Sequence, residues 1–314
     1  MNQPKRHSLR DAVPREWLTS YDHAWLTLYS IAMGTEREFK LAKRVELPGA
    51  LVLAFWGSMT YLDPSTLTLR FSPEGEIVVE GAISQRDSGE GAWLAVLQPC
   101  NTEAPSNEYT LKIKASVLTA LLIGLTTRNY AYSKIAENCV SLTADRATAA
   151  TSPILGPHGY DKPLRMSLDT FGAAASLLAQ TPDSERRRIE LSLHWYEKAL
   201  RSIGVDSFLN NWIAVETLAM PDTSNVRPVN ERLAAIYAMS YSDAAERFGV
   251  GRLLGLRSRI VHDGEDLIVH AQLADYMNLL YEDLLHASLG LASKNLGKVA
   301  LADGFAFEQL LGSP

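Results

Sequence analysis

The segment GLRSRIVHDG, residues 255–264, ends a predicted helix and determines how the second half of the chain is interpreted. The apolar positions that lead into it recur at helical spacing and define a buried stripe: Leu253, Leu256 and Ile260. An Asp-Gly pair then provides a natural stop, with Gly264 suited to a left-handed cap. His262 therefore falls in the last turn or just beyond it, where the helix macrodipole favours a positive charge.

Arg257 and His262 are the residues of this segment best suited to binding phosphate and transferring protons. Their spacing leaves two interpretations open. Residues five apart lie about 140° apart on an ideal α-helix. The two side chains therefore converge only if the helix frays at His262 or if the long arginine side chain reaches across. Arg259, three residues before His262, shares its face better. The segment is either a pair placed for chemistry or a capped helix with a solvated basic end.

The rest of the second half has the sequence pattern of a helical bundle. Amphipathic or strongly apolar segments follow one another, with cap signals at Asn230 and Ser242. The predicted helices cover residues 164–180, 184–203, 206–219, 230–239, 242–261 and 269–288. Together they predict an all-α bundle of four to six helices.

The first half of the chain has a different pattern, with short strand-like runs between two predicted helices. Residues 14–33 place apolar and aromatic side chains at near-helical spacing, and a further helix is predicted over 114–140. Between them, short β-branched and aromatic runs separated by turn signals predict a small antiparallel sheet over roughly 45–113. The fold class is therefore α+β. We expect an N-terminal sensor or regulatory domain over 1–150, a linker over 151–165, and a helical domain over 166–314.

Composition narrows the class of protein. The chain has 314 residues, a formal net charge of −6 and two cysteines. An acidic whole gives no reason for non-specific binding to nucleic acid or membrane, and two cysteines fit a reducing compartment. The N-terminus lacks the apolar core of a signal peptide, and the longest apolar run, at 115–125, is too short to span a bilayer. A cytoplasmic protein without membrane attachment is expected.

The sequence offers one candidate metal site, but a metal is not expected there. His262, Glu265, Asp266 and His270 gather metal-ligating side chains, but at no familiar ligand spacing. An acidic loop between two helices explains the same residues. The sequence therefore predicts neither a metal nor another cofactor.

Two further segments extend the pattern around RSRIVHDG. IELSLHWYEKAL, residues 189–200, predicts an aromatic helix, and FLNNWIAVETLAM, residues 208–220, places Trp212 and Glu216 one turn apart. With these segments, residues 185–290 resemble the HEPN superfamily, most closely its branch found in bacterial anti-phage and abortive-infection proteins. The Arg-Ser-x-Ile-Val-His-x-Gly core is the specific part of the resemblance.

The resemblance implies a chemistry. HEPN domains typically dimerise through their helices, and many are metal-independent endoribonucleases. In this chain Arg257 would hold the phosphate and His262 would be the acid or base. Ser258, Glu216 and Arg259 would be supporting residues. RNA would be the substrate, and a trigger or an antitoxin would bind the N-terminal domain in a phage-defence or toxin role.

Competing assignments are considered beside this one. Arg187 and Arg188 precede His194 at a similar spacing, but that pair lacks the helix-ending glycine. Six arginines against three acidic residues between 227 and 262 predict a local basic surface that would suit phosphates. Six Trp and Tyr residues of the helical half are expected in the core rather than as a base-stacking platform: Trp195, Tyr196, Trp212, Tyr237, Tyr276 and Tyr281.

Three functions remain open at this point. The first is a dimeric ribonuclease, and the second is a non-catalytic HEPN module that binds RNA, nucleotide or a protein partner. The third is a helical scaffold in which RSRIVHDG only closes a helix. The ribonuclease is favoured, because both the Arg and the His of the motif are present; the fold alone does not decide among the three, since function resides in sites rather than in folds.

Overall fold

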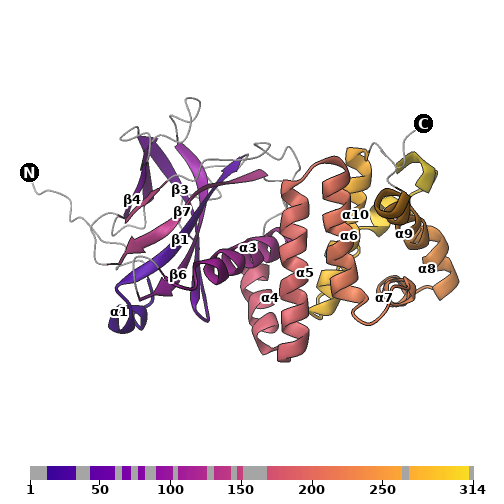
Figure 1. Ribbon diagram of the computed structural model, residues 1–314, viewed down its shortest axis with the longest axis horizontal. Coiled ribbons are helices and arrows are strands. Elements are labelled where there is room, and N and C mark those ends of the chain that lie inside the picture. The colour runs from indigo at the N-terminus through magenta and orange to yellow at the C-terminus, as the bar shows by residue number, and fades with distance from the viewer. Residues whose placement is uncertain are drawn as a thin grey trace, which may run out of the picture. The chain divides into compact units, whose positions relative to one another are not determined.

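The structure is a computed structural model that describes residues 13–32, 43–60, 66–71, 77–81, 90–101, 105–125, 131–142, 147–150, 168–263 and 269–310. The described chain is α+β, as the sequence predicts (Figure 1). It divides into two compact units: Met1–Leu118 with Thr126–Ser176, and Thr119–Leu125 with Leu177–Pro314. The predicted linker over 151–165 lies outside the described residues.

The first unit is built on a sheet in which eight described strands take part. Their bounds are β1 (His23–Ala32), β2 (Lys43–Leu47), β3 (Ala50–Thr60), β4 (Thr66–Phe71), β5 (Ile77–Gly81), β6 (Glu90–Cys100), β7 (Ala131–Ser141) and β8 (Ala147–Ala150). The order is β7-β1-β6-β3-β5-β4-β8, and β2 pairs with β3. The strands pair antiparallel except β3 with β5, which is parallel over Met59 and Thr60. The sheet is larger than predicted because β1, β7 and β8 join it.

The prediction of a helix over 14–33 is wrong except for the short helix α1 (Trp17–Ser20). The strand β1 lies between β6 and β7, and both of its faces are buried. Leu26 and Leu28 are at most 1% exposed on one face, and Trp25 is 4% exposed on the other. A strand buried on both faces lacks polar alternation, so apolar periodicity does not distinguish it from a helix.

The helix predicted over 114–140 is correct only in its first part. Helix α3 (Glu108–Gly124) begins earlier and ends at a glycine, and Ala131–Ser141 is the strand β7. Pairing of β7 with β1 buries Ile135 and Val140 in the core of the sheet. Tertiary pairing therefore decided this segment rather than local preference.

Helices form the described part of the second half, as predicted. They are α4 (Leu168–Gln180), α5 (Asp183–Arg201), α6 (Gly204–Ala219), α7 (Arg227–Tyr237), α8 (Tyr241–Phe248), α9 (Val250–Ser258), α10 (Ala271–Ser288) and α11 (Gly297–Ala300). A π-helical turn, η2 (Arg259–Asp263), follows α9, and a 3₁₀ turn, η3 (Phe307–Leu310), lies near the C-terminus. Four of the six predicted core aromatics are fully buried: Tyr196, Trp212, Tyr276 and Tyr281.

The helix predicted over 242–261 is divided into α8, α9 and η2. Gly249 breaks it with a φ of 59°, a left-handed conformation that glycine adopts at little cost. The cap is Ser240 rather than Ser242, because its side chain accepts a hydrogen bond from the backbone N–H of Asp243 at 3.1 Å. The predicted cap at Asn230 is also wrong: α7 begins at Arg227, and Asn230 is buried inside it.

A buried carboxylate ties the C-terminal segment to the bundle. Asp283 on α10 is 0% exposed and accepts hydrogen bonds from the Tyr237 hydroxyl at 2.5 Å and the Ser293 hydroxyl at 2.6 Å. The backbone N–H groups of Asn295 and Leu296 donate to it at 2.9 and 3.0 Å. Four donors satisfy this carboxylate, as a buried charge requires. Burial and the neighbouring carboxylate raise the pKa of Tyr237 above its ordinary value.

Candidate functional site

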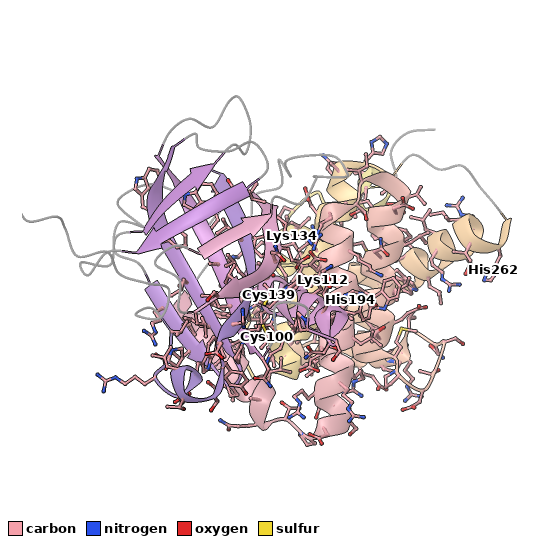
Figure 2. The ribbon with its side chains drawn as sticks, turned by 60° about the vertical axis from the view of Figure 1, so that its left-hand side comes forward. Cys100, Lys112, Lys134, Cys139, His194 and His262 are labelled. Atoms are coloured by element: carbon pink, nitrogen blue, oxygen red, sulfur yellow. The ribbon has the colours of Figure 1, made fainter. Side chains whose placement is uncertain are left out.

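The end of α9 brings Arg257 and His262 into contact. The Arg257 Nη1 and His262 Nε2 atoms lie 3.2 Å apart. Two members of the predicted buried stripe hold this helix in place, since Leu253 is 0% and Leu256 5% exposed, whereas the third, Ile260, is only half-buried. Arg257 is half-buried and His262 is exposed. Figure 2 shows His262 at the tip of the helical segment that continues α9.

A change of helix type explains why residues five apart converge. The backbone from Arg259 to Asp263 is π-helical, with hydrogen bonds from i to i+5. This wider turn reduces the angle between Arg257 and His262 from the roughly 140° of a regular α-helix. The helix therefore does not fray at His262, which was one of the two routes left open by the sequence; it continues to Asp263 as a wider, hydrogen-bonded turn. The predicted stop at Gly264 lies outside the described residues.

The contact assigns a donor and an acceptor role to the two side chains. A guanidinium group offers only donors, so His262 Nε2 accepts from Arg257. In the neutral imidazole the proton then resides on Nδ1. Protonation of Nε2 would remove the acceptor and release the Arg257 guanidinium.

The supporting residues are distributed over three elements. Ser258 is the last residue of α9, half-buried, and Arg259 is the first residue of η2 with an exposed side chain. Both follow Arg257 directly in the chain. Glu216 instead lies on α6 and lines a separate pocket, to which neither Arg257 nor His262 contributes. The structure thus brings together the two main predicted residues but not Glu216 with them.

The predicted basic surface around the segment is smaller than the arginine count implies. Arg227 pairs with Glu231 at 2.7 Å, and Arg252 pairs with Glu308 at 2.6 Å. Arg232 is turned inward and donates to the backbone carbonyl of Leu218 at 3.2 Å. Half of the six arginines are thereby committed to partners within the protein. The sequence count missed Glu308, which lies far along the chain.

The competing residues do not form a second pair of the same kind. His194 and His262 lie apart in the helical unit (Figure 2). Burial lowers the pKa of His194, and the nearby charges of Lys198 and Arg201 lower it further. Arg188 donates to Glu185 at 3.4 Å. Among the described residues no group of three or more His, Cys, Asp or Glu is arranged to hold a metal, while Glu265 and Asp266 lie outside them.

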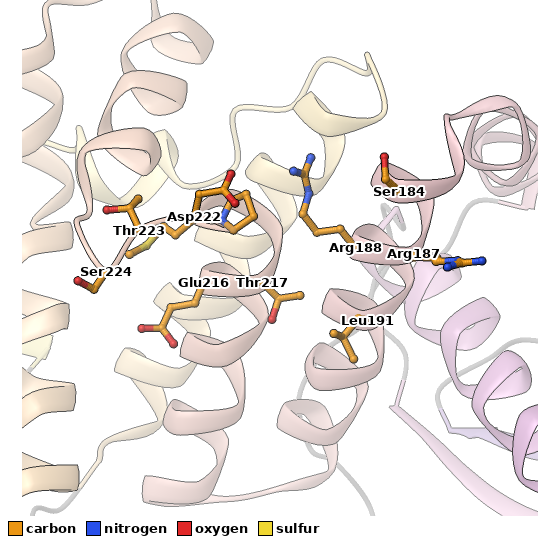
Figure 3. Close-up of a pocket in the computed structure, with 11 residues that line it drawn as sticks. Ser184, Arg187, Arg188, Leu191, Glu216, Thr217, Asp222, Thr223 and Ser224 are labelled. Atoms are coloured by element: carbon orange, nitrogen blue, oxygen red, sulfur yellow. The ribbon is translucent and has the colours of Figure 1, made fainter.

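The pocket that Glu216 lines was not predicted from the sequence. It has a volume of about 880 Å³ and lies between the first half of α5 and the end of α6 with the segment that follows it. Figure 3 shows the lining residues, which are Ser184, Arg187, Arg188, Leu191, Glu216, Thr217, Met220, Pro221, Asp222, Thr223 and Ser224. Two of the three consecutive arginines at 186–188, Arg187 and Arg188, line this pocket.

The chain was compared with protein families, curated proteins and solved structures. None of the three comparisons gave a match. Within the described residues, no helix combines the length and apolar character needed to cross a membrane. The candidate function therefore rests on the geometry of the Arg257–His262 pair and on the sequence around it.

Proposed function

We propose that this protein is a metal-independent endoribonuclease of the HEPN type, acting in phage defence, abortive infection or a toxin role. The observation that carries the proposal is the 3.2 Å contact between Arg257 and His262 at an exposed π-helical turn. π-Helical turns occur frequently at functional sites. The resemblance of RSRIVHDG to HEPN sequences supports the same two residues.

The proposed reaction uses a nucleophile that RNA itself carries. A base takes the proton of a ribose 2′-hydroxyl, whose oxygen attacks the adjacent phosphorus. The bond from phosphorus to the 5′-oxygen breaks, and an acid protonates that oxygen as it leaves. The products are a 2′,3′-cyclic phosphate and a free 5′-hydroxyl. The positive charge of Arg257 would stabilise the crowded, negatively charged phosphorane.

A homodimer through the helical unit would supply both proton-transfer groups. One chain offers one His262, which is either base or acid at a given moment. A two-fold axis at this face would bring two arginines and two histidines into one cleft. Val261, an apolar residue that is 47% exposed beside His262, is compatible with such a contact. The N-terminal unit would bind a trigger or an antitoxin.

One observation favours the alternative, a non-catalytic module that binds RNA, nucleotide or a protein partner. His262 Nε2 already accepts a hydrogen bond from Arg257, and this nitrogen cannot take a proton until that bond breaks. A pair that stays closed would bind phosphate without cleaving RNA. The two functions therefore differ in whether substrate opens the pair.

The decisive experiment is cleavage of cellular RNA by the purified full chain with excess chelator. We expect cutting that leaves 2′,3′-cyclic phosphate ends, and we expect Arg257→Ala and His262→Ala each to lower the rate by about 10²–10⁴-fold. Arg247→Ala is the matched control, because Arg247 is an exposed arginine on the preceding helix α8.

Each outcome separates the candidate functions. Cutting that survives both substitutions places the chemistry elsewhere and contradicts the site. RNA that is bound in an Arg257-dependent manner but never cut contradicts the enzyme and favours the binding module. Analytical ultracentrifugation of the same samples measures whether the chain is the dimer that the mechanism needs.

A further inference from the structure

The two cysteines of the chain meet in the first unit, although they are distant in the sequence (Figure 2). Cys100 is the last residue of β6, and Cys139 lies near the end of β7. Their Sγ atoms are 3.3 Å apart, and the two residues do not form a disulfide. Cys100 is buried and Cys139 is half-buried, so a small ion can reach the pair from the side of Cys139.

The strand order determines what kind of bridge these thiols can form. Strand β1 lies between β6 and β7, with His23 opposite Cys100 and Trp25 opposite Cys139. In a regular sheet, two strand spacings keep the Cα atoms roughly 9 Å apart. A disulfide needs Cα atoms within about 7 Å. The thiols therefore reach each other across β1, and the sheet favours a bridge that is longer than a sulfur–sulfur bond.

The surroundings of the thiols are apolar and held by regular elements. Trp25, Cys100 and Leu111 form one buried cluster, and Cys139 packs against it. Gln98 lies opposite Trp25 on β6 and is 1% exposed. Its Nε2 donates a hydrogen bond to the backbone carbonyl of Leu111 at 2.7 Å, which ties α3 to the sheet beside the thiols. The fold therefore positions both sulfur atoms before any ligand binds.

Trp25 supplies a hydrogen-bond donor that lacks an acceptor in this cluster. Its Nε1 atom is buried and has no hydrogen-bond partner among the described residues. A neutral thiol is a weak acceptor, whereas an ionised acceptor forms a stronger hydrogen bond. The Nζ atom of Lys112 lies 5.6 Å from the centroid of the Trp25 ring, and Lys112 also pairs with Glu108. A buried donor and a nearby cation would both offset negative charge on the sulfur atoms.

A set of two thiols selects the kind of ion. Thiolates prefer Cu(I), Zn(II) and iron–sulfur clusters to hard ions such as Mg²⁺ and Ca²⁺. Structural Zn(II) sites and iron–sulfur clusters take four protein ligands. In the part of the chain that the structure describes, no third His, Cys, Asp or Glu completes a group that could hold a metal. Cu(I) is stable with two thiolates, so the ligand set favours it.

The distance between the sulfur atoms is compatible with such an ion. Two metal–sulfur bonds of about 2.3 Å in a linear arrangement set the sulfur atoms about 4.6 Å apart. Rotation of the two side chains can widen the present 3.3 Å to this value. The wider separation also suits two strands that β1 keeps apart.

We propose that Cys100 and Cys139 together bind one Cu(I) ion. Binding releases the two thiol protons and leaves one Cu(I) between two thiolates, with one net negative charge. Trp25 Nε1–H and the Lys112 ammonium group offset this charge. The site lies in the first unit, and it does not depend on the proposed ribonuclease activity.

The test is an anaerobic titration of the purified full chain with Cu(I) in competition with the coloured chelator bicinchoninate. We expect one tightly held Cu(I) per chain. Cys100→Ser and Cys139→Ser should each lower the affinity by about 100-fold or more, because a single thiolate remains. Trp25→Phe keeps a ring and removes the Nε1–H, so it should lower the affinity about tenfold. Trp93→Phe is the matched control, since Trp93 is buried in the other core cluster of the sheet.

X-ray absorption at the copper edge of the loaded wild type should show two sulfur neighbours, and this measurement needs no variant. Thermal melts of every variant identify a loss of affinity that comes from unfolding. Four results would overturn the proposal: no Cu(I) retained against the chelator, unchanged affinity in either serine variant, copper neighbours other than two sulfurs, or a disulfide that forms readily with diamide. Equal losses in the Trp25 and Trp93 variants would overturn the role of the Trp25 donor.

Discussion

Two polar clusters of the helical unit differ in how completely their hydrogen bonds are satisfied. Asp283 is fully buried and accepts from four donors, whereas Arg257 and His262 share one hydrogen bond at an exposed turn. Loss of a satisfied buried group leaves several partners without water or protein to bond. Loss of the exposed pair leaves no buried group without a hydrogen-bond partner. The first cluster therefore serves the fold, and the second retains capacity for a ligand.

The sharpest test of this difference is Asp283→Ala. Four donors lose their acceptor, and each buried group left unpaired costs about 1–3 kcal/mol. Because the three part-buried donors can bond water instead, we expect about 3–5 kcal/mol off the free energy of unfolding rather than four full penalties. Urea denaturation followed by circular dichroism measures it. Ser293→Ala, which removes a single donor, should cost about 1 kcal/mol. Equal losses in the two variants would break the comparison, because Asp283 would then contribute no more than one bond.

A smaller loss of stability is expected at Gly249, where backbone conformation rather than a polar network positions helix α9. Gly249 has a φ of 59°, and a Cβ there would lie 2.7 Å from the Phe307 ring. Gly249→Ala should cost about 2–4 kcal/mol, from the left-handed conformation and the crowded ring together. Gly204→Ala is the control, since Gly204 has a φ of 58° and nothing within 4 Å.

Gly204→Ala should cost only about 1–2 kcal/mol, the conformational part alone. Thermal melts of the two alanine variants, measured side by side, give the difference. A melting temperature that falls equally in both would show that the Phe307 contact relaxes freely. The start of α9, and with it the Arg257–His262 pair, would then be less firmly placed than the contact indicates.

The smallest expected effect is on stability at the pair itself. Arg257→Ala and His262→Ala should each change the free energy of unfolding by no more than about 0.5 kcal/mol, as is usual for surface positions. The same denaturation experiment measures this. A loss above about 2 kcal/mol in either variant would assign the pair to the fold and remove the contrast with Asp283.

The sequence predicted the helical half well because its apolar residues recur with helical period around one core. It failed at His23–Ala32 and Ala131–Ser141, two neighbouring strands whose character depends on partners distant in the chain. No local pattern could identify β1 as a strand, since side chains on both of its faces are buried. The α+β class survived because the central strands are flanked by turn signals.

The candidate site was predicted unevenly, for geometric reasons. The sequence identified Arg257 and His262 but not the π-helical turn, which depends on backbone hydrogen bonding that residue types do not encode. It placed Glu216 with this pair because of a resemblance, and the structure places it in another pocket. That pocket combines residues 184–191 with 216–224, so only the packing of α5 against α6 reveals it.

The π-helical turn also bears on how much the chain length between Arg257 and His262 can vary. In a regular α-helix, side chains four apart share a face, whereas the wider turn lets side chains five apart do so. The turn therefore absorbs one additional residue without separating the two side chains. A chain shortened by one residue within 258–261 could keep the same two groups adjacent on an ordinary α-helix. Adjacency of the pair, rather than a fixed count of intervening residues, is what this part of the backbone preserves.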